Sequence, residues 1–118
     1  MINKAILIGR LTKDIELMQS KNGKKVVQFT LAVNRDKDNA DFINCVAWEK
    51  TAELMSQYLQ KGSLIGVEGT IRTRQYQDKT DRTVFVTEIL VNQVQFLESK
   101  QKTQQSSNYS IDDDELPF

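Results

Sequence analysis

The sequence contains no histidine and only one cysteine among its 118 residues. Histidine is the commonest general base and the commonest transition-metal ligand, so its absence removes the usual basis of both kinds of site. Cys45 lies in a predicted strand, cannot form an internal disulfide, and is expected to be a small buried apolar residue. The sequence has no nucleophile–base pair, metal-ligand spacing or glycine-rich phosphate loop, and Glu68 and Glu88 are too isolated to act as an acid–base pair. We therefore expect no catalytic activity, no cofactor and no metal.

Long apolar runs and a strong net charge are also missing. The apolar run within residues 1–10 is too short for a signal peptide or a membrane span, which predicts a cytoplasmic protein. The formal net charge is zero, which at first argues against a nucleic-acid partner. The charge is unevenly distributed, however: residues 1–98 carry 14 Lys and Arg against 12 Asp and Glu, and residues 99–118 carry 2 against 4. The chain therefore has a weakly basic body and an acidic end.

Five segments have the pattern of β-strands, and one has the pattern of a helix. Asn22-Gly23 is a strong signal for a hairpin turn, and Gly9 indicates a bulge or a close backbone approach. The spacing of Ala52, Met55 and Leu59 predicts one apolar helix face, with Gly62 as the stop. The predicted strands are 4–11, 27–33, 42–48, 64–76 and 82–96, and the predicted helix is 49–60.

The order of these elements predicts an all-β fold, the five-stranded oligonucleotide-binding (OB) barrel with one helix between strands three and four. A two-sheet sandwich is the main alternative. Apolar periodicity stops after residue 98, so we expect one domain over 1–98. It is followed by a disordered Gln/Ser-rich spacer over 99–111 and an acidic tip over 112–118.

Two predicted strands place aromatic or basic side chains on one face. The first is the stretch 67–76, which reads V-E-G-T-I-R-T-R-Q-Y, together with Ile65 just before it. If this segment is extended, Ile65, Val67 and Ile71 point to one side. The other side carries Glu68, Thr70, Arg72, Arg74 and Tyr76. In 42–48, one face carries Phe42, Asn44, Val46 and Trp48, and the other carries Ile43, Cys45 and Ala47. Flat rings beside guanidinium groups suggest a platform for stacked bases and phosphates.

Each of these side chains also has an ordinary structural interpretation. Phe42 and Trp48 could belong to the core of a sheet packed on both sides, and Tyr76 could cap the end of a strand. Arg72 and Arg74 could form a solvated face. The lysines around the Asn22-Gly23 turn, Lys21, Lys24 and Lys25, are assigned mainly to solubility, with contact to DNA as the alternative.

Five stretches in the same order resemble the bacterial-type single-stranded DNA-binding proteins. They are I-N-K-A-I-L-I-G-R-L at 2–11, the N-G turn followed by F-T-L-A-V at 29–33, Y-L-Q-K-G-S at 58–63, V-E-G-T-I-R-T-R-Q-Y at 67–76, and the acidic end with its terminal Pro-Phe. The resemblance implies an OB fold, a homotetramer, and sequence-independent wrapping of single-stranded DNA in replication, recombination and repair. It also implies a C-terminal tip that recruits genome-maintenance proteins.

The resemblance assigns roles position by position. Base-stacking rings would be Phe42, Trp48 and Tyr76, and phosphate contacts would come from Lys4, Lys50, Lys61, Arg72 and Arg74. The partner-binding tip would consist of Asp112, Asp113, Asp114, Glu115, Leu116, Pro117 and Phe118. The terminal apolar residues argue against a merely solubilising tail, because an exposed aromatic does not aid solubility.

Three departures from the family pattern stand out. The loop 34–41 lacks the usual further aromatic and has Lys37 at about that place. Ile43 replaces a histidine found in many members at a position of subunit contact, and the tip has an extra Glu115-Leu116. A primosome-type accessory protein with the same barrel, or a purely structural oligomer subunit, are the alternative functions.

Overall fold

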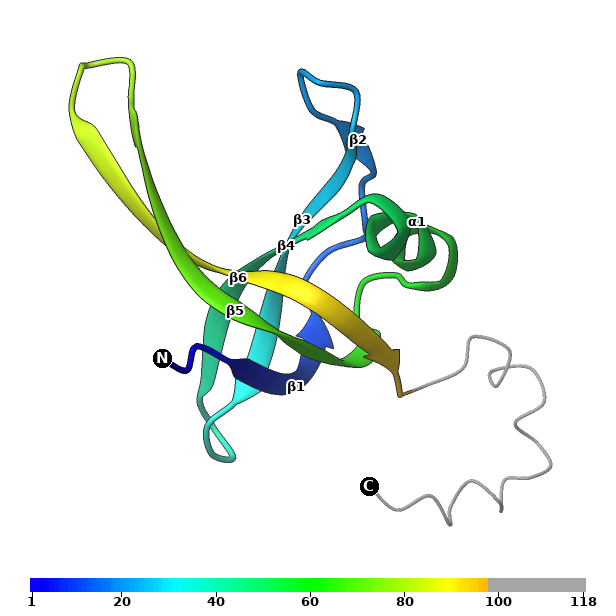
Figure 1. Ribbon diagram of the computed structural model, residues 1–118. Helices are drawn as coiled ribbons and strands as arrows, with labels where there is room; N and C mark the ends of the chain where they lie inside the picture. Colours follow the sequence, from blue (N-terminus) through cyan, green and yellow to red (C-terminus); the bar gives the residue numbers. More distant parts are fainter. Residues whose placement is uncertain (98–118) are drawn as a thin grey trace, which may run out of the picture.

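The computed structural model describes residues 1–97, and the strands and helix follow the predicted order (Figure 1). The elements are β1 (Ala5–Leu11), β2 (Met18–Gln19), β3 (Lys25–Asn34), β4 (Ala40–Trp48), α1 (Glu49–Tyr58), β5 (Leu64–Gln77) and β6 (Thr83–Phe96). The five predicted strands and the helix are thus confirmed, and the two-residue β2 is an addition. The predicted spacer 99–111 and tip 112–118 lie outside the described residues.

The strands close into a barrel. β1 pairs antiparallel with β5 along its length and with β3 at its end, where Leu11 lies opposite Leu31. The ring continues from β5 to β6, β4 and β3, and β4 and β6 are parallel. A two-sheet sandwich is therefore the wrong alternative, and the predicted OB architecture is confirmed.

Gly9 lies where the backbone of β1 passes close to β3. A Cβ atom at Gly9 would collide with the backbone carbonyl of Ala32 and press on the side chain of Leu31. The close backbone approach predicted from this glycine is confirmed, and it allows β1 to reach β3 and complete the ring.

The helix α1 covers one end of the barrel. Its Ala52 and Met55 are fully buried, and Leu59 directly after it is also buried against the core. Gly62, at φ +88°, lets the chain turn back, and its backbone N–H donates to the carbonyl of Leu11 at 2.9 Å. The predicted helix stop is confirmed.

The β5–β6 hairpin is longer than the barrel needs. Its distal half projects away from the body (Figure 1). The buried face of β5 ends near Val67 and Gly69, whereas Ile71, on the same side, is 46% exposed. The expectation that Ile71 belongs to the core is wrong for the isolated chain, because the hairpin has left the barrel at that point.

Candidate nucleic-acid interface

Arg72 and Arg74 are held by one buried carboxylate. Arg72 lies directly opposite Glu88 in the β5–β6 register. Oε2 of Glu88 accepts hydrogen bonds from Nε of both arginines, each at 3.1 Å, and Glu88 is only 5% exposed. A guanidinium has five N–H donors. Each arginine therefore uses its Nε on the protein and keeps its terminal amino groups for another anion.

Tyr76 continues this surface toward the tip of the hairpin. It shares the outward side of β5 with Arg72 and Arg74, and its ring is 48% exposed. The guanidinium carbon of Arg74 lies 5.9 Å from the centre of the Tyr76 ring, within the range of a cation–π contact. The structure thus places a ring and two cations next to one another, as the alternation in 67–76 predicts.

The hairpin faces a groove over the outer surface of β3 and β4. This groove has a volume of about 400 Å³, and its lining joins Arg74, Tyr76 and Glu88 of the hairpin to Thr30 and Asn44. Residues of the segment after β1 also line it, namely Lys13, Asp14 and Glu16. Polar and aromatic groups from four separate parts of the chain therefore meet here.

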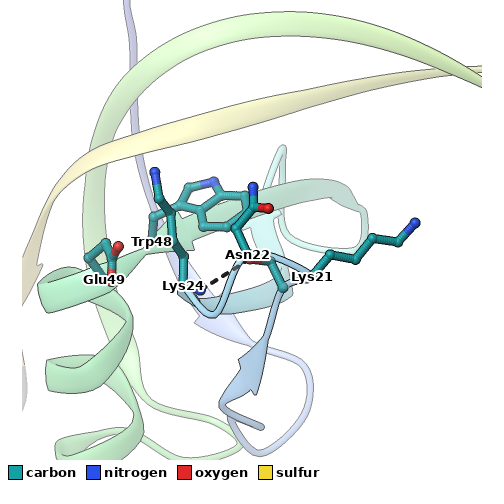
Figure 2. Close-up of a pocket in the computed structure, with 6 residues that line it drawn as sticks. Lys21, Asn22, Lys24, Trp48 and Glu49 are labelled. Carbon is teal, nitrogen blue, oxygen red and sulfur yellow. Dashed lines mark hydrogen bonds between the residues drawn. The ribbon is translucent and has the colours of Figure 1, made fainter.

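Trp48 lines a second hollow, at the end of β4. This hollow has a volume of about 450 Å³ and is lined by Trp48, Glu49 and four residues of the turn before β3, which are Ser20, Lys21, Asn22 and Lys24 (Figure 2). Trp48 is half-buried. The sequence indicated the ring but not the turn beside it.

Phe42 lies on the same side of β4 as Trp48 and is 67% exposed. The interpretation of Phe42 as a core residue is therefore wrong.

The opposite side of β4 supplies buried Cys45 and Ala47 to the core. Burial raises the pKa of the Cys45 thiol to about 12, with a further contribution from the charge of Glu88. Cys45 is thus an apolar core residue at neutral pH, as expected.

The three lysines assigned by resemblance lie elsewhere on the surface. Lys4 forms an ion pair with Glu68 at 2.6 Å, and Lys50 is exposed in the first turn of α1. Lys61 follows the helix, and its backbone N–H donates to Asp14. None of the three lines either hollow, so their contact with DNA stays a prediction.

Glu88 is the residue that pattern analysis of the site passed over. The sequence pattern gives Glu88 no role, because it is too isolated there to be proposed as an acid–base partner of Glu68. Counting the register outward from the turn at residues 78–82 would have placed Glu88 opposite Arg72. The signal was present, but it depends on the pairing of two strands rather than on one.

Within residues 1–97, no group of three or more histidine, cysteine, aspartate or glutamate side chains is arranged to hold a metal ion. The same part of the chain contains no helix of the length and apolar character required to traverse a bilayer.

Barrel, hairpin and outer rings together define an OB-fold protein with an exposed surface of aromatic and guanidinium groups. The chain matches the single-strand binding protein family over residues 2–97. It is 53% identical over 106 residues to the single-stranded DNA-binding protein of Halalkalibacterium halodurans, and the match covers 85% of this chain and 63% of that protein. The chain belongs to the single-strand binding protein family.

Two further relatives have similar coverage. Single-stranded DNA-binding protein A of Bacillus subtilis is 51% identical over 106 residues, which are 85% of this chain and 62% of the relative. Single-stranded DNA-binding protein 3 of Listeria innocua is 47% identical over 127 residues, covering 95% of this chain and 79% of the relative. The chain thus spans a little over three fifths of the length of the first and second of these three relatives.

Proposed function

We propose that the protein binds single-stranded DNA without sequence preference and protects it during replication, recombination and repair. This rests on one observation: Phe42, Trp48 and Tyr76 lie on the outer surface of the barrel and hairpin, together with the paired guanidinium groups of Arg72 and Arg74. Every base has a π face, so stacking on such rings does not depend on the base. Phosphate contacts through arginine add affinity that is likewise independent of sequence. The function is binding alone, without catalysis, and its cytoplasmic location remains a prediction from the sequence.

The affinity for oligo-dT is expected to fall linearly with salt on logarithmic axes, because neutralised phosphates release counterions. Replacing Arg72 and Arg74 together by alanine removes two ionic contacts. The magnitude of the slope should then fall by about 1.4, since each contact to a single strand contributes about 0.7. Titration of Trp48 fluorescence with poly-dT at several salt concentrations measures both slopes.

The matched control removes two positive charges from the turn at the tip of the hairpin, at Lys79 and Arg82, by replacement with glutamine. If this pair of replacements flattens the salt dependence as much as the arginine pair does, the specific role of Arg72 and Arg74 is wrong. A salt-independent affinity of the unchanged protein would contradict the proposed electrostatic contribution itself.

A homotetramer is part of this proposal, and two observations support an assembly of copies. Ile6 and Ile8 of β1 are exposed apolar residues. Within the described residues, the first part of β1 is paired on one side only, with β5, because β3 pairs with β1 only at Arg10 and Leu11. A free strand edge that carries apolar side chains is a natural place for a second chain. Ile43, at the position of the expected subunit contact, packs against the core.

The acidic tip is proposed to recruit genome-maintenance proteins. Its sequence, D-D-D-E-L-P-F, combines carboxylates for a basic rim with a terminal Phe118 for an apolar pocket. Deleting residues 112–118 is expected to abolish the capture of partner proteins and to leave DNA binding equal or slightly tighter, because acidic groups no longer compete with DNA. Pull-down and oligo-dT titration on the same preparation measure both. A loss of DNA affinity on deletion would contradict this role of the tip.

A further inference from the structure

The turn between β2 and β3 is a defined structure beside the ring of Trp48. The backbone N–H of Ser20 donates to the carbonyl of Lys24 at 2.8 Å, and that of Gly23 donates to the carbonyl of Ser20 at 2.9 Å. Ser20 Oγ accepts a further bond from the backbone N–H of Lys24 at 3.2 Å. Gly23 has φ +83°, a conformation that glycine adopts without strain. The positions of Asn22 and Lys24 are therefore set by the backbone of the turn.

The strand register places this turn at the Trp48 end of β4. Val26 of β3 pairs with Met18 of β2 on one side and with Trp48 of β4 on the other. Lys25, at the start of β3, forms an ion pair with Glu53 of α1. The base of the turn is thus attached both to the sheet and to the helix.

The charges around the hollow are arranged asymmetrically. Figure 2 shows Lys24 and Asn22 beside the indole of Trp48, Lys21 extending away from it, and Glu49 on the side of the ring where Lys24 lies. Unlike Lys25, Lys24 has no acidic partner within residues 1–97. A negatively charged group entering the hollow is attracted toward Lys24 and repelled by Glu49.

The dimensions and chemistry of the hollow suit one nucleotide. Its volume of about 450 Å³ lies within the range of roughly 300–1,000 Å³ typical of small-ligand pockets. The indole offers a stacking face, the ammonium of Lys24 offers a phosphate contact, and the amide of Asn22 can both donate and accept hydrogen bonds.

We propose that Trp48, Lys24 and Asn22 form a subsite for a single nucleotide of the bound strand. The base stacks on Trp48, its phosphate contacts Lys24, and Asn22 hydrogen-bonds to the base edge or the sugar. This rests on the proposed binding of single-stranded DNA and extends it to the turn 20–24, to which the resemblance assigns no DNA contact and whose lysines the sequence assigns mainly to solubility. Lys24 is thereby a contact residue rather than a solubilising one.

The test compares K24Q with K79Q, which removes the same charge from the exposed turn at the tip of the β5–β6 hairpin. Binding of fluorescently labelled oligo-dT is measured by anisotropy between about 0.1 and 1 M salt. For K24Q we expect about fivefold weaker binding at the lower salt and a salt slope reduced in magnitude by about 0.7, because one phosphate contact is lost. For K79Q we expect less than a twofold change. Equal effects of the two variants would overturn the proposal.

A double-mutant cycle with W48L tests whether ring and ammonium hold the same nucleotide. If they do, K24Q/W48L loses less affinity than the product of the two single losses, because the second replacement acts on a nucleotide that has already been released. Multiplicative losses would overturn the shared subsite. Should W48L melt at a much lower temperature, the comparison of K24Q with K79Q still decides, because Lys24 and Lys79 are both exposed. Unchanged binding by K24Q contradicts only this inference, whereas failure of the unchanged protein to bind oligo-dT contradicts the proposed function.

Discussion

Replacing Phe42 and Tyr76 together by alanine is expected to weaken the binding of oligo-dT by thirtyfold or more. Each stacked base contributes roughly 1–3 kcal/mol, so two lost rings amount to about 2–6 kcal/mol. Both rings are largely exposed, so the melting temperature should hardly change. Trp48 is retained in this variant, and its fluorescence still reports binding.

The control for this pair is Phe85→Ala. Phe85 is 75% exposed on the same hairpin but lies opposite Gln75, on the side away from Tyr76. We expect its removal to change affinity by less than twofold. If it weakens binding as much as the loss of Phe42 and Tyr76, then DNA does not follow the proposed face. A large fall in melting temperature for the F42A/Y76A variant would instead mean that the two rings stabilise the fold.

Replacing Gly9 by alanine is expected to destabilise the fold strongly. The added methyl group meets the backbone carbonyl of Ala32, and a backbone cannot move aside without loosening the contact that closes the barrel. Overpacking of this kind costs about 1–3 kcal/mol or more. The melting temperature should fall by about 4–8 °C for each kcal/mol, as for other small domains. Thermal unfolding followed by circular dichroism measures this.

Gly66→Ala provides the same chemical change at a neighbouring place in the sheet. A Cβ at Gly66 has no neighbour closer than 3.8 Å among the atoms of Gln95, Ile8 and Leu7, which is an ordinary contact. Its effect should be small, because alanine also lowers the entropy of the unfolded chain. Equal melting temperatures for the two variants would mean that the close approach at Gly9 does not limit the closure of the barrel.

Most of the fold followed from local pattern. Alternation at residues 27–33 and at 64–76 identified strands, and the change of period at Ala52, Met55 and Leu59 identified the helix. Ile71 marks the limit of this reasoning, because alternation tells which side of a strand a residue occupies but not whether the barrel still lies beneath it. The two-residue β2 was not predicted because so short a strand has no period to detect.

The sequence predicted only some residues of the candidate site. The others were not identified for one shared reason. Phe42, Trp48 and Tyr76 were selected as flat rings on predicted outward faces, and the structure leaves the first and last exposed and Trp48 half-buried. Glu88 and Lys24 were not selected, because a single carboxylate or a lysine in a turn has no distinctive pattern of its own. Both acquire their significance from a residue on another strand.

By itself, the sequence determined the order of strands and helix, the side of the strands at 27–33 and 64–76 that faces the core, and the set of rings and cations available for binding. These are properties of neighbouring residues, fixed by the two-residue period of a strand and the turn chemistry of glycine and asparagine. Only the tertiary structure decided that Glu88 holds two arginines and that the turn at Asn22 lies beside Trp48. It also decided that the hairpin carries Ile71 beyond the core. These depend on register and on the closure of the barrel, which bring together residues distant in the chain.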